Sequence, residues 1–228
     1  MLYYDLHIHS CLSPCAQDDM TPQNVCGMAR LKGLDVIALT DHNSGGNLVA
    51  FSKAAWEYGL LFIPGMELCT AEEVHILAYF QNLDDALLAS EAVRSHLPKK
   101  KNKPDFFGRQ LLVDEKDQPC GEEDALLIGA LDLSLEETLA LIRSCSGIAV
   151  PAHVNRGYGM IYTLGFIPQQ AGFKVVEQGV GEAPIKGMKC IHNSDAHDLG
   201  AISERENALL ADDLDGVLTF LREGRTTA

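Results

Sequence analysis

Short apolar runs alternate with helical stretches along most of this 228-residue chain. The run at residues 2–8 predicts a first strand, and Thr21-Pro22 predicts a helix start, with threonine as N-cap and proline in the first turn. Further strands are expected at residues 34–40, 60–67, 74–79, 147–153, 174–177 and 187–191, and helices at about 47–58, 84–97, 134–144 and 214–223. Strands separated by helices predict a mainly parallel sheet, and this length favours a single α/β barrel over an open sheet.

Residues 98–131 interrupt this alternation. Two apolar runs, 110–113 and 125–128, flank a polar stretch, so we expect a hairpin or small insertion over the active site of one domain spanning residues 1–228. The segment also holds the one basic cluster of the sequence, Lys99-Lys100-Lys101 with Lys103, which we expect to be a solvated loop.

The formal net charge of −14 opposes binding to a long nucleic acid. The sequence has no apolar run of about 18 residues and no secretory leader, so neither a membrane span nor secretion is expected. Seven scattered cysteines without a CxxC pair predict free thiols in a reducing cytoplasm. The oligomeric state is left open by the sequence.

Six of the eight histidines fall at or near the ends of predicted strands. His7 and His9 are two residues apart, so both imidazoles point to the same side of a strand and can bind one metal. In barrels of this kind, polar residues at the carboxyl ends of strands carry function. The candidate ligands at or just after the ends of predicted strands are His7, His9, His42, Glu67, His153, Asp195 and His197, and the strand at residues 74–79 carries a further candidate, His75.

Mixed imidazole and carboxylate ligands suit Zn, Mn or Fe. Eight ligands exceed what one ion needs, so we expect two or three divalent transition metals, with Glu67 as the bridging carboxylate. Such a centre generates a metal-activated hydroxide and clamps both oxygens of a displacement, which favours phosphate-ester hydrolysis. Arg156, three residues after His153, is expected to bind the substrate phosphate, with a surface salt bridge as the alternative.

Taken in order, these segments resemble the four motifs of the PHP (polymerase and histidinol phosphatase) family. The matching stretches are Asp5-Leu6-His7-Ile8-His9-Ser10, Thr40-Asp41-His42, Pro151-Ala152-His153 with Arg156, and Ser194-Asp195-Ala196-His197. The resemblance implies a distorted seven-stranded (β/α) barrel and a trinuclear site with nine ligands, eight of which are those named above. The arginine after the third motif resembles the stand-alone phosphoesterase branch.

The ninth ligand departs from the family pattern. Cys15 falls where histidinol phosphatases have a histidine, whereas Asp18 would match the aspartate of the phosphoesterase branch, and Asp19 is a further alternative. Outside the ligand set, Asp41 is expected to orient a ligand or to take part in proton transfer. His192 is expected to support the site or to protonate the leaving group, against the alternative of an ordinary strand histidine.

The function predicted from these motifs is metal-dependent hydrolysis of a small phosphorylated metabolite or nucleotide. One alternative is a 5′-to-3′ exonuclease that acts on short oligonucleotides. A second is a metal-binding module without catalysis, which would bind metal tightly and turn nothing over.

Overall fold

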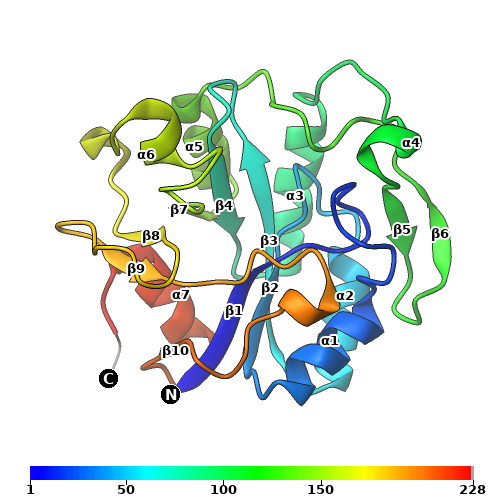
Figure 1. Ribbon diagram of the computed structural model, residues 1–228, viewed down its shortest axis with the longest axis horizontal. Coiled ribbons are helices and arrows are strands. Elements are labelled where there is room, and N and C mark those ends of the chain that lie inside the picture. Colours follow the sequence, from blue (N-terminus) through cyan, green and yellow to red (C-terminus); the bar gives the residue numbers. More distant parts are fainter. Residues whose placement is uncertain (227–228) are drawn as a thin grey trace.

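A curled six-stranded sheet organises the computed structural model, which describes residues 1–226 (Figure 1). The strand order is β10-β1-β2-β3-β4-β7. These strands span Ala208–Leu209 (β10), Leu2–Ile8 (β1), Val36–Leu39 (β2), Leu61–Cys69 (β3), His75–Tyr79 (β4) and Ile148–Pro151 (β7). β8 (Val175–Glu177) and β9 (Lys189–Ile191) form a separate two-stranded parallel sheet.

The α/β class is confirmed, but the mainly parallel, closed barrel is wrong. β1, β2 and β3 are parallel, whereas β3 pairs antiparallel with β4, and β4 pairs antiparallel with β7. Only residues 70–74 connect β3 to β4, and a parallel crossover needs a dozen residues or more. The sheet therefore turns back on itself and forms a half-barrel.

Five longer helices flank the sheet: α1 (Pro22–Leu31), α2 (Leu48–Glu57), α3 (Leu83–Arg94), α5 (Leu135–Ser144) and α7 (Leu214–Glu223). α5 begins with the expected capping box, in which Ser134 and Glu137 bind each other's backbone N–H groups. Thr21 precedes α1 as predicted but makes no side-chain cap hydrogen bond. The shorter elements α4 (Pro104–Phe107), α6 (Met160–Leu164), two 3-10 turns (Gln169–Ala171 and Leu199–Ala201) and β10 were not expected from the sequence.

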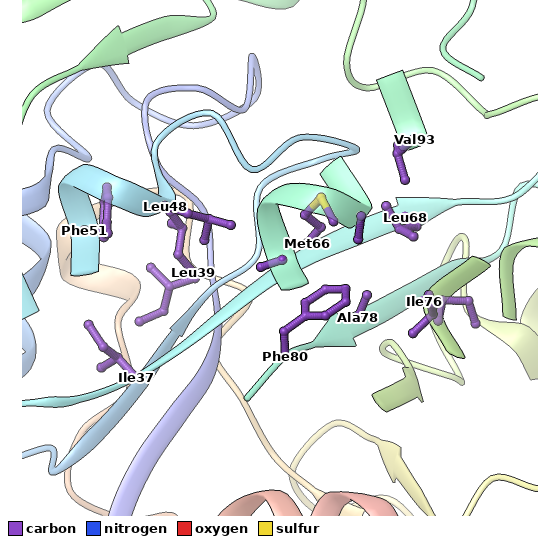
Figure 2. Packing of buried hydrophobic residues seen from close by; sticks show 14 of the residues in the cluster. Ile37, Leu39, Leu48, Phe51, Met66, Leu68, Ile76, Ala78, Phe80 and Val93 are labelled. Carbon is purple, nitrogen blue, oxygen red and sulfur yellow. The ribbon is translucent and has the colours of Figure 1, made fainter. Parts of the chain in front are cut away.

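Both faces of the sheet are buried, which explains the continuous apolar runs. Successive residues of β2 point to opposite faces: Ile37 and Leu39 pack toward the α1–α2 side, and Val36 and Ala38 pack on the α7 side. Figure 2 shows Leu39 beside Leu48 and Phe51 of α2. No helix within residues 1–226 has the length and apolar character needed to cross a membrane.

Residues 98–131 form an irregular segment against the carboxyl end of the parallel strands. Its hairpin pairs β5 (Leu111–Val113) with β6 (Pro119–Glu122), and not with the apolar run at 125–128. Buried amides attach the segment to the half-barrel: Asn47 donates to the Leu111 carbonyl and accepts from the Val113 N–H. Asn43 donates to the carbonyls of Leu127 and Gly129.

Candidate metal centre

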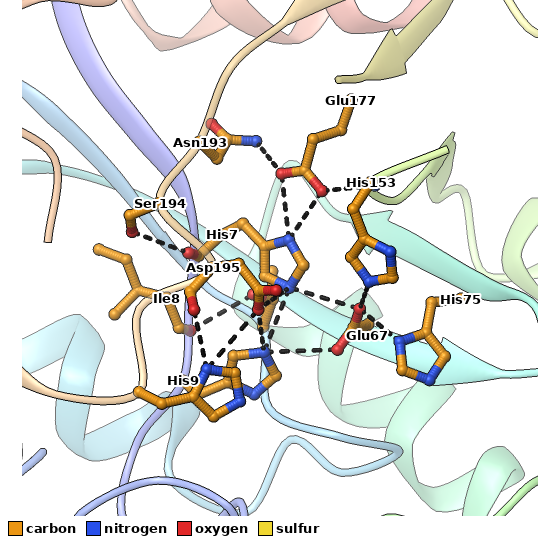
Figure 3. Close-up of polar contacts among 12 residues, drawn as sticks. His7, Ile8, His9, Glu67, His75, His153, Glu177, Asn193, Ser194 and Asp195 are labelled. Atoms are coloured by element: carbon orange, nitrogen blue, oxygen red, sulfur yellow. Dashed lines mark hydrogen bonds and ion pairs between the residues drawn. The ribbon is translucent and has the colours of Figure 1, made fainter. Parts of the chain in front are cut away.

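His7 and His9 stand at the carboxyl end of β1 with both side chains on the same side, as their spacing predicts. Both are completely buried, and their Nε2 atoms lie 3.2 Å apart (Figure 3). Asp195, in the loop after β9, places Oδ1 at 3.3 Å from each of these two nitrogens. Three donors from two ends of the chain therefore converge on one point.

Glu67 of β3 lies at the middle of the cluster and is buried. Its Oε1 is 2.8 Å from Nδ1 of His75, 3.0 Å from Nε2 of His153 and 3.4 Å from Nε2 of His7. Its other oxygen, Oε2, is 3.1 Å from Nδ1 of His42 and 3.3 Å from Nε2 of His9. One carboxylate thus contacts five imidazoles, as a bridging ligand would.

Within residues 1–226, three groups of side chains bring their donor atoms close enough to hold a metal ion. The groups are His7–His9–Glu67–Asp195, His42–Glu67–His75 and His9–His42–His197. Any two of these groups share one residue, which is Glu67, His9 or His42. The arrangement is a compact triangle of overlapping sites, not three separate ones.

The hydrogen bonds behind His7 and His9 show that this donor set fits cations. Glu177 is an acceptor, so Nδ1 of His7 carries a proton and donates to it, at 3.0 and 3.1 Å. The Ser13 hydroxyl donates to Asp41 and therefore accepts from Nδ1 of His9, at 2.9 Å. Both Nε2 atoms thus face the centre, 3.2 Å apart and surrounded by carboxylate oxygens. A positive ion held between these nitrogen and oxygen atoms would be bound by all of them.

Electrostatics in the metal-free centre follow from burial and charge. Burial lowers the pKa of His9, but Asp195 and Glu67 outweigh it and raise the value to about 9. Burial also lowers the pKa of His7, but Glu177, Asp195 and Glu67 outweigh it and hold that pKa well above its usual value. Burial instead dominates at His42, where it lowers the pKa to about 4. Protons and metal ions therefore compete for the His7–His9 end of the cluster.

The backbone is held in an uncommon conformation at two of these residues. His153 has φ of 26° and Asp195 has φ of 55°, in the left-handed region that non-glycine residues seldom adopt. Such residues persist where the surrounding structure over-determines them, and they cluster at functional sites. His153 is fixed by its N–H, which donates to Glu177 at 2.8 Å.

A cavity of about 250 Å³ opens above the cluster. Histidine and carboxylate side chains of the cluster line it, together with Ile128, Arg156 and Tyr158. Arg156 is 52% exposed, and its Nη2 lies 3.4 Å from Oδ2 of Asp195. The ring of Tyr158 stacks on His75, with centroids 4.8 Å apart. The structure thus brings Arg156 to the mouth of the site, where its guanidinium remains accessible.

Other predicted residues lie away from this cluster or behind it. Cys15 and Asp18 are exposed and belong to none of the three groups found within residues 1–226, and Asp18 faces Arg109 at 3.4 Å. Asp41 lies behind His9, where it accepts hydrogen bonds from Ser10 and Ser13. His192 is half-buried and its Nδ1 donates to the Gln178 carbonyl, so it does not line the cavity.

Sequence reasoning missed Glu177, which supports both His7 and His153. Its signal was present: it ends the predicted strand at residues 174–177, the same placement that identified the ligands. Asp5 was also missed as a buried support. It accepts from the N–H groups of Ser194 and Ser203 and so fixes the loop that carries Asp195.

Comparison with known structures places the fold. The chain aligns with the lesion-specific endonuclease PfuEndoQ of Pyrococcus furiosus at a TM-score of 0.69 and 18% identity, covering 97% of this chain and 56% of that one. A proposed metal-dependent phosphoesterase from Bifidobacterium adolescentis aligns at a TM-score of 0.59 and 18% identity, over 97% of this chain and 98% of that one. At these identities the likeness concerns the fold alone.

Sequence comparison gives the family. An uncharacterized protein of Methanocaldococcus jannaschii is 34% identical over 88 residues, which cover 35% of this chain and 51% of that protein. This chain thus spans about half the length of the curated relative that it matches. The PHP domain model matches residues 5–143, more than half of the chain, and that range includes His7, His9, His42, Glu67 and His75. The chain belongs to the PHP domain family.

Proposed function

We propose that this protein is a metal-dependent phosphoesterase that acts on a small phosphorylated metabolite or nucleotide. The observation that carries the proposal is the triangle of overlapping donor groups beneath an accessible arginine. Glu67, His9 and His42 are each shared by two groups, and Arg156 lines the cavity over the cluster, 3.4 Å from Asp195. A multinuclear cation centre facing a guanidinium is suited to an ester of phosphate.

Each residue has a role that follows from its position. The seven side chains of the three donor groups, together with His153 beside Glu67, would hold two or three ions of Zn, Mn or Fe, with Glu67 in the bridging place. When bound, such metals supply Lewis acidity toward a phosphate and lower the pKa of a coordinated water. Arg156 binds and orients the non-bridging phosphate oxygens with its planar fork. Asp41 and Glu177 orient His9 and His7 from behind.

The size of the cavity restricts the substrate. A volume of about 250 Å³ is below the roughly 300–1,000 Å³ of typical small-molecule pockets. It accommodates a phosphate and its nearest substituents, whereas the remainder of the substrate lies outside the mouth. A second candidate, cleavage of short oligonucleotides, is favoured by this arrangement because such a substrate presents one phosphodiester and extends beyond the cavity. The endonuclease activity of the Pyrococcus furiosus relative accords with it.

Elemental analysis of the purified protein, followed by a phosphate-ester screen after loading with Zn, Mn or Fe, tests the proposal. We expect two to three metals per chain and release of phosphate or alcohol from at least one monoester or diester. Glu67→Gln should abolish turnover and reduce the metal content, while Glu136→Gln, at an exposed carboxylate of α5, should leave both unchanged. Full metal loading without turnover on a broad panel would overturn the proposal in favour of a non-catalytic metal-binding module.

A further inference from the structure

A groove beside the metal cavity combines lysines with phenylalanines. Its walls include the side chains of Lys100, Lys103, Phe106, Phe107 and Leu126, and Lys101 and Asn102 also line it. We call it the Lys–Phe groove, and its volume is about 590 Å³. It lies in the segment that carries α4, at the upper right of Figure 1. Nothing in the proposed chemistry accounts for it.

The charge of the groove is opposite to that of the protein. Residues 99–107 contain four lysines and one acidic residue, Asp105, in a chain with a net charge of −14. Lys101 faces Asp124 at 3.0 Å, whereas Lys99, Lys100 and Lys103 are exposed and form no ion pair with any residue of 1–226. A local concentration of cations on an acidic protein attracts a polyanion to that place.

The aromatic side chains narrow the class of polyanion. Phe106 is 79% exposed, and its ring meets that of Phe107 edge-on with centroids 4.6 Å apart. An exposed phenylalanine on a four-residue helix adds nothing to the core. Cationic side chains interleaved with exposed rings bind single-stranded nucleic acid, since the backbone pairs with the cations and bases stack on the rings. An acidic peptide would need only the lysines.

Backbone contacts connect the groove to the metal cavity. The N–H of Leu126 donates to the carbonyl of Lys100 at 2.9 Å, and Ile128, two residues further on, lines the cavity. Two extended residues span about 7 Å. On the other side of the segment, Gly108 lies so close to the carbonyl of Pro14 that a Cβ there would overlap it. The groove is therefore held within the reach of a few nucleotides from Glu67.

We propose that the Lys–Phe groove binds the single-stranded nucleotide chain that extends from a phosphodiester held in the metal cavity. This proposal rests on the phosphoesterase function above and narrows its substrate to short single-stranded oligonucleotides. Lys100 and Lys103 contact the phosphate backbone, and Phe106 stacks on a base. The overall negative charge then restricts binding to short strands, because longer ones meet the acidic surface beyond the groove.

Binding and catalysis are to be measured separately on the metal-loaded protein. Fluorescence anisotropy with a labelled phosphorothioate hexanucleotide reports binding, and hydrolysis of bis(p-nitrophenyl) phosphate reports the centre. We expect K100E/K103E to weaken oligonucleotide binding at least tenfold. The slope of log K for binding against log salt concentration should become shallower by about 1.4, which is about 0.7 for each lost contact to a phosphate of a single strand. F106A should weaken binding about tenfold. Neither variant should change hydrolysis of the small diester by more than about twofold.

The matched control reverses two exposed lysines elsewhere. K174E/K189E changes the net charge by the same amount at the ends of β8 and β9 and should leave oligonucleotide binding within about twofold of wild type. Equal weakening by both double variants, or no binding by the wild type, would overturn the proposal. So would poly-glutamate competing as well as the oligonucleotide, since it would assign the groove to an acidic protein segment. If the wild type binds the oligonucleotide, K100E/K103E weakens that binding, and the small diester is not hydrolysed, the phosphoesterase function is contradicted. The assignment of the groove to single-stranded nucleic acid would then stand.

Discussion

Glu177 and His7 are joined by a buried hydrogen bond, with Nδ1 of the imidazole 3.0 and 3.1 Å from the two carboxylate oxygens. The same carboxylate accepts from the N–H of His153 and from Nδ2 of Asn193, at 2.8 and 2.7 Å. It therefore fixes the proton of His7 on Nδ1 and directs Nε2 to the centre. One side chain from β8 thus orients the imidazole of His7 on β1 and holds the backbone of His153 just after β7.

Replacing Glu177 by glutamine should lower metal affinity by about 10- to 100-fold, because the amide offers one acceptor oxygen in place of two. Isothermal titration of the metal-free protein with Zn or Mn measures the effect. E136Q, on the exposed side of α5, is the matched control and should titrate as wild type. Unchanged affinity in a folded E177Q protein would show that the His7 tautomer does not depend on this bond.

Ser13 should be as important to His9 as Glu177 is to His7. Its hydroxyl accepts from Nδ1 of His9 and from the N–H of His42, at 2.9 and 3.2 Å, and donates to Asp41 at 2.7 Å. Alanine removes the partner of His9 Nδ1 and of the His42 N–H, whereas Asp41 keeps its bonds from Ser10, so S13A should lose about 1–3 kcal/mol of stability and reduce metal affinity roughly tenfold. Urea unfolding and metal titration measure the two effects. S144A, at an exposed serine of α5, should change neither.

Local patterns predicted most of the fold. The first strand has the predicted bounds, α1 begins at the predicted residue, and the Ser134–Glu137 capping box marks the start of α5. The prediction of a mainly parallel sheet was wrong for β4 and β7, because apolar periodicity carries no information on the direction of pairing. The five residues between β3 and β4 did carry it, since a connection of that length permits only an antiparallel turn.

The candidate site was predicted where ligands lie within strands or a few residues after them, and was left open in the loop after His9. The strand-end rule brought His7, His9 and Glu67 to one place without any knowledge of tertiary contacts. It fails after His9, where the chain turns irregularly: Cys15 and Asp18 differ by three residues, and spacing alone does not say which faces the centre. Their exposure in the structure leaves the ninth ligand a prediction that metal titration of C15S and D18N would test.

Arg156 should act on substrate binding more than on metal binding. Its guanidinium is half exposed at the cavity mouth and lies 3.4 Å from Oδ2 of Asp195, and this exposure to solvent makes the ion pair weak. R156A should raise KM for a phosphate ester about 10- to 100-fold with metal content unchanged. R156K should recover only part of the loss, because an ammonium lacks the planar fork. Steady-state kinetics test this, with R222A on α7 as the control. A loss of metal in R156A would contradict this role.

The pH dependence of stability should differ between metal-free and metal-loaded protein. The folded-state pKa of His9 is raised from 6.5 to about 9, because Asp195 and Glu67 outweigh the opposing effect of burial. A raised folded-state value means that protonation stabilises the metal-free protein. That stability is fully present below pH 6.5 and is lost as pH rises toward 9. His7 acts in the same direction, and His42, with a pKa near 4, stays neutral across this range.

Metal binding reverses this trend because the ligands must be deprotonated. Between pH 6.5 and 9 the Tm of the EDTA-treated protein should fall, and the increase in Tm on adding excess Zn or Mn should grow. The change should reach several degrees, since about 1 kcal/mol moves Tm by roughly 2–4 °C in a domain of this size. Differential scanning calorimetry at a series of pH values measures both curves. H96Q, at a partly exposed histidine that faces Asp132, should reproduce them. A metal-induced increment that shrinks as pH rises would show that protons do not compete with metal at His7 and His9.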